Sequence, residues 1–283
     1  MMSDKCIYFE VCADFNKYTR FNIKNIFRYN TMKKIEDDKK ITYIIYKYNE
    51  HQDRMINKID RKIGRIVGKN KKTKIILSKE IKEICKDKKE HKHIYSLIKY
   101  YEGNKQIFND CIEEILENVI KIQNETKEEQ SIYILAKSNQ VKNENRIINM
   151  LFNYKAINIV TPNIKDFKRL EDFLDEHLET ISIINNKRKS LSRAKYIINI
   201  DFSKDELLEY NINRTAIIFN LNYERLDIKN FDGVIINNIN INNLQEKFDI
   251  QDLYLTKEIS IEHISNYIKE GDYKLIGNNG YVF

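Results

Sequence analysis

Short apolar runs alternate with segments of helical periodicity in the second half of the chain. The runs are rich in Ile and Val, which is typical of strands buried on both faces of a parallel sheet. They span residues 132–136, 156–160, 181–184, 196–200, 215–220 and 234–236. Helices are expected between them at residues 144–154, 165–177, 187–194 and 204–210. The alternation predicts a doubly wound, Rossmann-like α/β domain over residues 131–245.

The first half of the chain carries a different pattern, which predicts a smaller α/β domain over residues 1–125 with a β-hairpin and amphipathic helices. Runs rich in β-branched and aromatic residues predict strands, two of them joined as a hairpin around residues 36–40. These strands cover residues 6–11, 25–35, 41–48 and 73–77. Apolar residues at helical spacing predict helices over residues 51–67, 78–85, 94–101 and 107–122.

The uniformly polar residues 123–130 separate the two patterns, so they are predicted to form an exposed connector between domains. Residues 246–283 are predicted to form an extension that holds a helix at residues 258–269 and a terminal hairpin. Gly277-Asn278-Asn279-Gly280, between two apolar pairs, is the turn signal of that hairpin.

Composition excludes several classes of protein. Hydrophobic residues make up 42 % of the 283 residues, which excludes wholesale disorder, and a single Pro with 7 Gly excludes a collagenous chain. The abundance of Ile, Lys and Asn is typical of a low-GC bacterium. The net charge of +7 is spread along the chain apart from one basic run at residues 69–74, so nucleic acid is not expected as a partner.

No apolar stretch is long enough for a signal peptide or a transmembrane helix, so we expect a soluble, cytoplasmic protein without membrane contact. The four Cys residues show no CxxC spacing and no HExxH motif is present, so no metal site is expected. Cys85 and Cys111 lie on apolar helix faces and are expected in the core.

Five segments carry a resemblance to a known class of domain: residues 131–136 (Ser-Ile-Tyr-Ile-Leu-Ala), residues 158–163 (Asn-Ile-Val-Thr-Pro-Asn), residues 193–201, ending Ile-Ile-Asn-Ile-Asp, and residues 215–222 and 231–236, which match the last two strands. In order and spacing they resemble the NAD(P)-binding domain of glutamyl-tRNA reductases and shikimate dehydrogenases. That resemblance implies a Rossmann fold and a nicotinamide cofactor. The whole chain also resembles a protein family of low-GC, clostridia-like bacteria, and no activity carries over from that family.

The chain departs from those families where the cofactor would bind. Their phosphate loop needs glycines so that the backbone can approach the pyrophosphate. Here residues 136–141 hold no glycine, and none occurs between Gly103 and Gly233. Thr161-Pro162-Asn163 stands where an acidic residue would bind the ribose. Neither the reductases' Cys motif nor the dehydrogenases' Lys–Asp pair is found, so no catalytic residue is assigned and NAD(P) is disfavoured.

Two groups of residues remain as ligand-binding candidates. Five follow the first two strands of the second domain: Lys137, Ser138, Asn139, Thr161 and Asn163. Three more follow its third strand, where backbone N–H groups and cations at a helix start could hold a phosphate or carboxylate: Asn186, Lys187 and Arg188. A solvated helix start in a Lys-rich chain is the simpler explanation of the second group. Asp201 either contacts a ligand or caps the next helical turn.

Three functions stay open. The missing glycines favour a non-catalytic protein on a dehydrogenase-like scaffold, acting through a partner or a small anionic ligand. The strand pattern keeps an NAD(P)-dependent oxidoreductase with an aberrant phosphate loop as an alternative. Net charge alone supports a nucleic-acid-binding protein.

Overall fold

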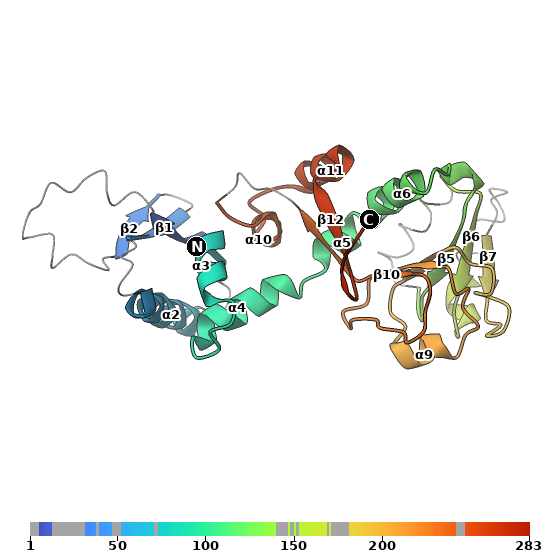
Figure 1. Ribbon diagram of the computed structural model, residues 1–283, viewed down its shortest axis with the longest axis horizontal. Coiled ribbons are helices and arrows are strands. Elements are labelled where there is room, and N and C mark those ends of the chain that lie inside the picture. Colours follow the sequence, from blue (N-terminus) through green and yellow to red (C-terminus); the bar gives the residue numbers. More distant parts are fainter. Residues whose placement is uncertain are drawn as a thin grey trace, which may run out of the picture. The chain divides into compact units, whose positions relative to one another are not determined.

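The computed structural model describes residues 6–12, 32–37, 40–46, 52–70, 73–139, 147, 150, 153–168, 170, 181–241 and 247–283. The chain forms two compact units (Figure 1). Unit 1 combines residues 1–104 with residues 243–260, and unit 2 combines residues 105–242 with residues 261–283. The first boundary between the units, at residues 104–105, precedes the predicted connector at residues 123–130. The predicted C-terminal extension, residues 246–283, is divided between the two units.

Unit 1 is built on a four-stranded sheet in the order β2-β3-β1-β4. Its strands are β1 (Cys6–Cys12), β2 (Met32–Glu36), β3 (Lys40–Tyr46) and β4 (Ile75–Leu77). The predicted hairpin is confirmed, because β2 pairs antiparallel with β3. The central strand β1 pairs parallel with both β3 and β4.

Helices cover one face of this sheet: α2 (Gln52–Lys69), α3 (Lys79–Cys85) and α4 (Lys92–Glu102). Phe9 and Ile45 of the sheet pack with Ile56 and Ile59 of α2 in the core of the unit. The predicted N-cap of α3 is confirmed, since the Ser78 hydroxyl accepts the Ile81 N–H.

The returning segment of unit 1 forms α10 (Ile250–Leu255), which sequence periodicity did not predict. Phe248, ahead of this helix, packs on Cys6 and Tyr8. Lys82 Nζ lies 2.5 Å from Asp249 Oδ2 and 2.6 Å from Asp252 Oδ2. Burial raises the pKa of Asp252 to about 7 against the opposing effect of Lys82. These contacts attach residues 247–258 to unit 1 although they lie far from it in sequence.

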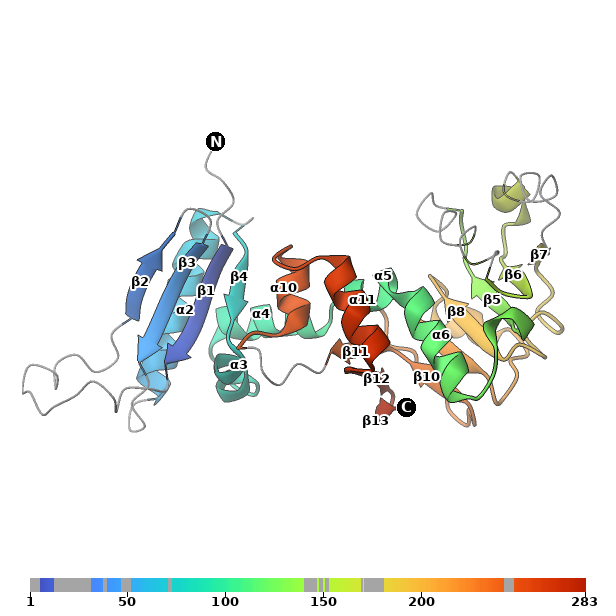
Figure 2. The ribbon, with the colours of Figure 1, turned by 90° about the horizontal axis from the view of Figure 1, so that it is seen from above.

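Unit 2 contains a sheet of six strands that are all parallel, flanked by helices (Figure 2). The strands are β5 (Ser131–Leu135), β6 (Ala156–Val160), β7 (Ile181–Ile184), β8 (Tyr196–Asn199), β9 (Ile217–Asn220) and β10 (Val234–Ile236). Their order is β10-β9-β8-β5-β6-β7. Counted within the sheet this is 3-2-1-4-5-6 from the β7 edge, an order compatible with a Rossmann-like fold.

Further elements complete unit 2. Its helices include α5 (Gln106–Asp110), α6 (Ile112–Ile122), α9 (Lys204–Leu208) and α11 (Ile261–Glu270), with short 3₁₀ helices η3 (Lys127–Glu129) and η4 (Ile164–Phe167). A small antiparallel sheet joins β11 (Asn238–Ile241), β12 (Tyr273–Gly277) and β13 (Gly280–Val282). The predicted terminal hairpin is therefore confirmed. The predicted helix over residues 107–122 is broken at Cys111, between α5 and α6.

Residues 123–130 are mostly exposed, as predicted. They are nevertheless attached to the rest of unit 2, because Glu125 accepts a hydrogen bond from the Tyr196 hydroxyl at 2.8 Å and pairs with Lys195. The prediction of a helix over residues 187–194 is wrong. Residues 187–193 form successive turns rather than a helix. The predicted helices at residues 144–154 and 165–177 lie mostly outside the described residues.

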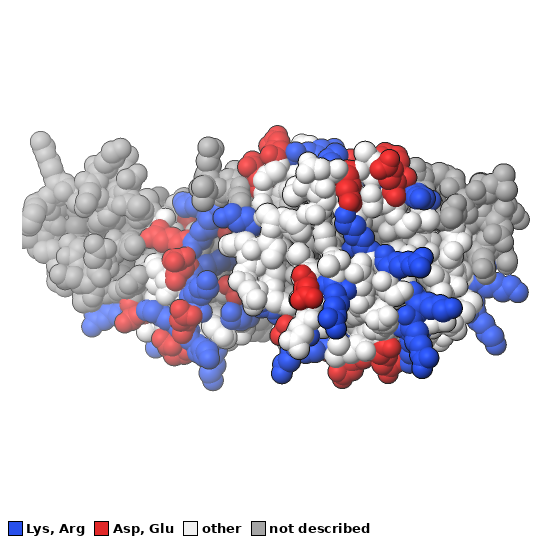
Figure 3. Space-filling model, turned by 45° about the vertical axis from the view of Figure 1, so that its right-hand side comes forward, with Lys and Arg blue, Asp and Glu red and all other residues white. Residues whose placement is uncertain are grey.

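Surface charge on the face shown in Figure 3 is mixed, with Lys and Arg side chains interspersed with Asp and Glu. Among the described residues, no helix has the length and apolarity needed to cross a bilayer. Cys85 and Cys111 are both fully buried, as predicted, and burial raises the pKa of each thiol to about 12.

Gly233 provides a test of how closely β10 pairs with β9. A Cβ at this position would lie 2.1 Å from the backbone oxygen of Ala216, which accepts the Val234 N–H in the ladder. We expect Gly233→Ala to lower the free energy of unfolding by about 3 kcal/mol, at the upper end of the overpacking range. Gly68→Ala is the control, since nothing lies within 4 Å of its Cβ position in α2. It should raise stability by up to about 1 kcal/mol. Equal effects of the two variants in urea unfolding would contradict this pairing.

Candidate functional site

The candidate site lies at the carboxyl ends of β5 and β8, which are neighbours at the centre of the parallel sheet. The chain leaves β5 toward β6 on one side and leaves β8 toward β9 on the other. Such a reversal of strand order is the place where open α/β sheets bind their ligands. Lys137 follows β5 and Asp201 follows β8, so the two residues stand on either side of the reversal.

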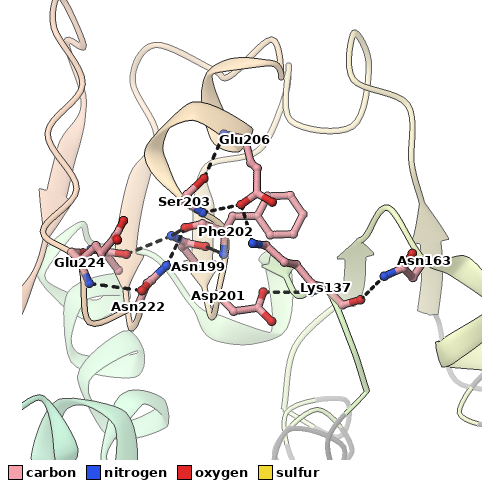
Figure 4. Close-up of polar contacts among 10 residues, drawn as sticks. Lys137, Asn163, Asn199, Asp201, Phe202, Ser203, Glu206, Asn222 and Glu224 are labelled. Atoms are coloured by element: carbon pink, nitrogen blue, oxygen red, sulfur yellow. Dashed lines mark hydrogen bonds and ion pairs between the residues drawn. The ribbon is translucent and has the colours of Figure 1, made fainter.

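Lys137 is bonded to the chain itself at three points (Figure 4). Its backbone N–H donates to Asp201 Oδ1 at 2.9 Å, and its Nζ lies 2.7 Å from Glu206 Oε2. Its carbonyl accepts a hydrogen bond from Asn163 Nδ2 at 2.9 Å. The N–H at the start of the first loop, which a phosphate would need, is thus held by an internal carboxylate.

The two carboxylates at this position differ in their surroundings. Burial raises the pKa of Asp201, and the Lys137 N–H opposes that effect. Partial burial also acts to raise the pKa of Glu206, but hydrogen bonds from Lys137 and Ser203 lower it overall. Glu206 and Ser203 form the capping box of α9, so local sequence fixes the position of the Glu206 side chain. Asp201 bonds to the β5 loop rather than to the next helical turn, which Ser203 caps instead.

The remaining predicted residues at the first two strands lie close to Lys137 in the chain or bond to it. Thr161 is fully buried, and its hydroxyl accepts the Asn163 N–H at 3.1 Å. Ser138 and Asn139 are half-buried directly after Lys137. The structure therefore brings Lys137, Thr161 and Asn163 together, while the loop from residue 140 to residue 146 lies outside the described residues.

The predicted anion site after β7 is bonded internally as well. Asn186 Oδ1 accepts the N–H groups of Arg188 and Lys189, both at 3.0 Å. Lys187 pairs with Glu209 of the segment that follows α9. The backbone donors that were expected to receive an anion are therefore occupied by the Asn186 side chain, and the expected helix start is a turn.

Three buried asparagines occupy the carboxyl ends of the next strands. Asn199 ends β8, Asn220 ends β9 and Asn237 follows β10, with exposures of 0 %, 0 % and 4 %. Asn199 Nδ2 donates to Asn220 Oδ1 at 3.0 Å, and Asn220 Nδ2 donates to Asn237 Oδ1 at 2.8 Å. Asn237 Nδ2 continues the row to Asn278 Oδ1 at 2.8 Å. We call these four residues the asparagine ladder.

The ladder also fixes the loops that follow β8 and β9. Asn199 bonds both the N–H and the carbonyl of Phe202, at 3.0 and 2.9 Å. Asn237 does the same for Leu226, at 2.9 and 3.1 Å. An amide can donate and accept at once, and a buried polar group left unbonded costs about 1–3 kcal/mol. The ladder therefore fills this half of the sheet edge with bonded groups of the chain itself.

The sequence contained a signal for the ladder that the motif search missed. The last three parallel strands end in the same pattern of three apolar residues and an asparagine: Tyr-Ile-Ile-Asn199, Ile-Ile-Phe-Asn220 and Val-Ile-Ile-Asn237. In-register parallel pairing places Asn199 opposite Asn220, so a repeated residue becomes a row.

Lys105 is a second feature that sequence reasoning missed. It is 5 % exposed, and its Nζ donates to the backbone carbonyls of Asn220, at 3.1 Å, and Asn222. Burial, assisted by the charge of Arg225, lowers the pKa of Lys105 to about 8. Its partners are neutral carbonyl oxygens beside the ladder, so this lysine secures the end of β9.

Within the described ranges, no three His, Cys, Asp or Glu side chains gather in a way that could hold a metal ion. No family model matches the chain, and no curated protein matches it. The geometry of the carboxyl edge is therefore the basis for any functional assignment.

Lys105 gives a pH-dependent test of this site. Since its pKa is about 8 in the folded chain and near 10.5 when unfolded, the unfolded state binds more protons between these values. The contribution of Lys105 to the free energy of unfolding should therefore rise with pH across this window, by roughly 3 kcal/mol. Wild type should gain that amount relative to Lys105→Met in urea titrations from about pH 8 to pH 10.5.

The difference in free energy of unfolding between wild type and Lys105→Met reports on Lys105 alone, because the buried cysteines contribute equally to both proteins. Lys229→Met, at an exposed position, is the matched control for the loss of one lysine. A wild-type-minus-Lys105→Met difference that stays constant with pH would show that Lys105 is not buried as described.

Proposed function

We propose that this chain is a non-catalytic protein whose unit 2 is a Rossmann-like scaffold, and that it acts through a partner rather than through a dinucleotide. One observation carries the proposal: the Asp201 carboxylate accepts the Lys137 N–H at the reversal of strand order. A pyrophosphate at this position would have to displace a carboxylate of the same charge sign.

The rest of the carboxyl edge supports the same conclusion. Glu206 pairs with the Lys137 side chain, which is the first cation in the chain after β5. The asparagine ladder occupies the ends of β8 to β10, where the second half of a dinucleotide would lie. A small anionic ligand at this edge would meet the same two carboxylates, so the proposal favours a macromolecular partner.

An NAD(P)-dependent oxidoreductase is the second candidate, and the strand order 3-2-1-4-5-6 favours it. A fold alone does not assign a chemical activity. The internal hydrogen bonds at the carboxyl edge of the sheet argue against an oxidoreductase. The two candidates differ in whether the folded chain binds a nicotinamide dinucleotide.

Thermal unfolding with NADH or NADPH at about 1 mM separates them. We expect no shift in Tm for the wild-type chain, because the N–H and the side chain of Lys137 are already bonded. A ligand at 100 times its Kd stabilises by about 2.7 kcal/mol, which is roughly 5–10 °C for a chain of this size. A shift of that order would overturn the proposal in favour of the oxidoreductase.

The variant Asp201→Asn tests the role of this carboxylate directly in the same thermal-unfolding experiment. This change removes the negative charge and keeps the size of the side chain, so inorganic pyrophosphate should stabilise the variant more than wild type. Asp205→Asn, on the exposed side of α9, is the matched control and should leave the response unchanged. Equal stabilisation of both variants by pyrophosphate would show that the Asp201 carboxylate does not exclude an anion from this position.

A further inference from the structure

The exposed face of α2 in unit 1 carries a continuous row of cations. Arg54, Lys58, Arg61, Arg65 and Lys69 are all exposed, at intervals of four, three, four and four residues. At 3.6 residues per turn these positions lie within about 80° around the helix axis, and they extend over roughly 22 Å of its length. We call these five residues the α2 basic row.

The opposite face of α2 is fixed in the core of unit 1. Met55, Ile56, Ile59 and Ile63 are at most 2 % exposed, and they pack against the sheet and α4. Figure 2 shows α2 behind the strands, packed on one face of the sheet. The α2 basic row therefore points away from the unit on a helix whose orientation is set by packing.

The two acidic residues of α2 do not lie in the row and are engaged elsewhere. Asp53 pairs with Lys88 at 2.6 Å, and Asp60 accepts the N–H groups of His93 and Ile94 at the start of α4. The helix holds six basic and two acidic residues, a net charge of +4. Its exposed face thus differs from the mixed charge of the surface in Figure 3.

We propose that the α2 basic row binds the phosphate backbone of double-stranded nucleic acid without sequence preference. Three of the five cations are Arg, whose guanidinium can bond two phosphate oxygens at once. A helix about 10–12 Å wide fits along or into a major groove about 12 Å wide. The charge is spread along the linear sequence, which argued against nucleic acid, but the helix gathers it on one face.

Two other polyanionic partners fit the row less well. A helix that binds a membrane surface inserts its apolar face into the lipid, whereas the apolar face of α2 is buried in unit 1. An acidic protein would need carboxylates spaced along the whole row, whereas a nucleic acid backbone presents regular charge along its length. The inference names the partner that the proposed function leaves open. Its test uses a different ligand from NADH, so either can fail without the other.

The test is a fluorescence-anisotropy titration of the full chain with a labelled duplex of about 20 base pairs, over about 50–200 mM salt. Five phosphate contacts predict a slope of about −4.5 in log K against log salt, or roughly 500-fold weaker binding across this range. The variant Arg54→Gln/Arg61→Gln/Arg65→Gln/Lys69→Gln should reduce the slope to about −1. Gln is a good helix former, so α2 should persist, which circular dichroism can check.

The matched control removes four exposed basic residues of unit 2: Lys165→Gln, Lys168→Gln, Arg214→Gln and Lys229→Gln. It lowers the net charge equally and should keep most of the wild-type slope. Two duplexes of unrelated sequence should bind alike. Equal losses in both quadruple variants, or no binding of wild type at about 50 mM salt, would overturn the proposal. Binding to vesicles with anionic lipid but not to the duplex would do the same and point to a membrane.

Discussion

Buried polar groups at the carboxyl edge of a parallel sheet must be bonded, and in this chain the edge bonds them with its own side chains. Asn199, Asn220 and Asn237 share their amides in a row, and Asn199 and Asn237 hold the loops after β8 and β9. Lys105, which is 5 % exposed, donates a hydrogen bond to the carbonyl at the end of β9, and Asp201 accepts one from the loop after β5. Each of these bonds stabilises the fold and also removes a donor or acceptor that a ligand would use.

This dual effect is the basis of the proposal that the sheet edge binds no dinucleotide. Six parallel strands in the order 3-2-1-4-5-6 are compatible with a Rossmann-like fold, and such folds bind ligands where the strand order reverses. Here Lys137 and Asp201 close that position across the reversal. The absence of glycine after β5 agrees with the proposed function, under which this loop binds no pyrophosphate and needs no close backbone approach.

Much of the fold could be predicted from the sequence because buried parallel strands are short, apolar and separated by helices. All six strands of unit 2 and the hairpins at β2–β3 and β12–β13 lie where the pattern placed them. The prediction of a helix over residues 187–194 was wrong because the Asn186 side chain accepts hydrogen bonds from the N–H groups that follow it, which favours a turn. The break at Cys111 and the attachment of α10 to unit 1 depend on tertiary packing, which periodicity does not encode.

The candidate site was predicted less well, for a related reason. Sequence reasoning placed Lys137, Thr161 and Asn163 at one edge correctly, because parallel strands bring their carboxyl ends together. It could not foresee that Asp201 would bond the Lys137 N–H, since the partner of a backbone donor depends on the neighbouring strand. It also treated charge as a property of the linear chain, and so overlooked the cations that α2 gathers on one face.

Amide hydrogen exchange at Lys137, followed residue by residue by NMR, tests the central claim most directly. If the Asp201 carboxylate holds this N–H, exchange should be slow in the wild-type chain, fast in Asp201→Ala and unchanged in Asp205→Ala. NADH at about 1 mM should leave the Lys137 resonance and its exchange rate in the wild-type chain unaltered. Equal protection in wild type and Asp201→Ala, or a displaced Lys137 resonance with NADH, would contradict the account of a closed carboxyl edge.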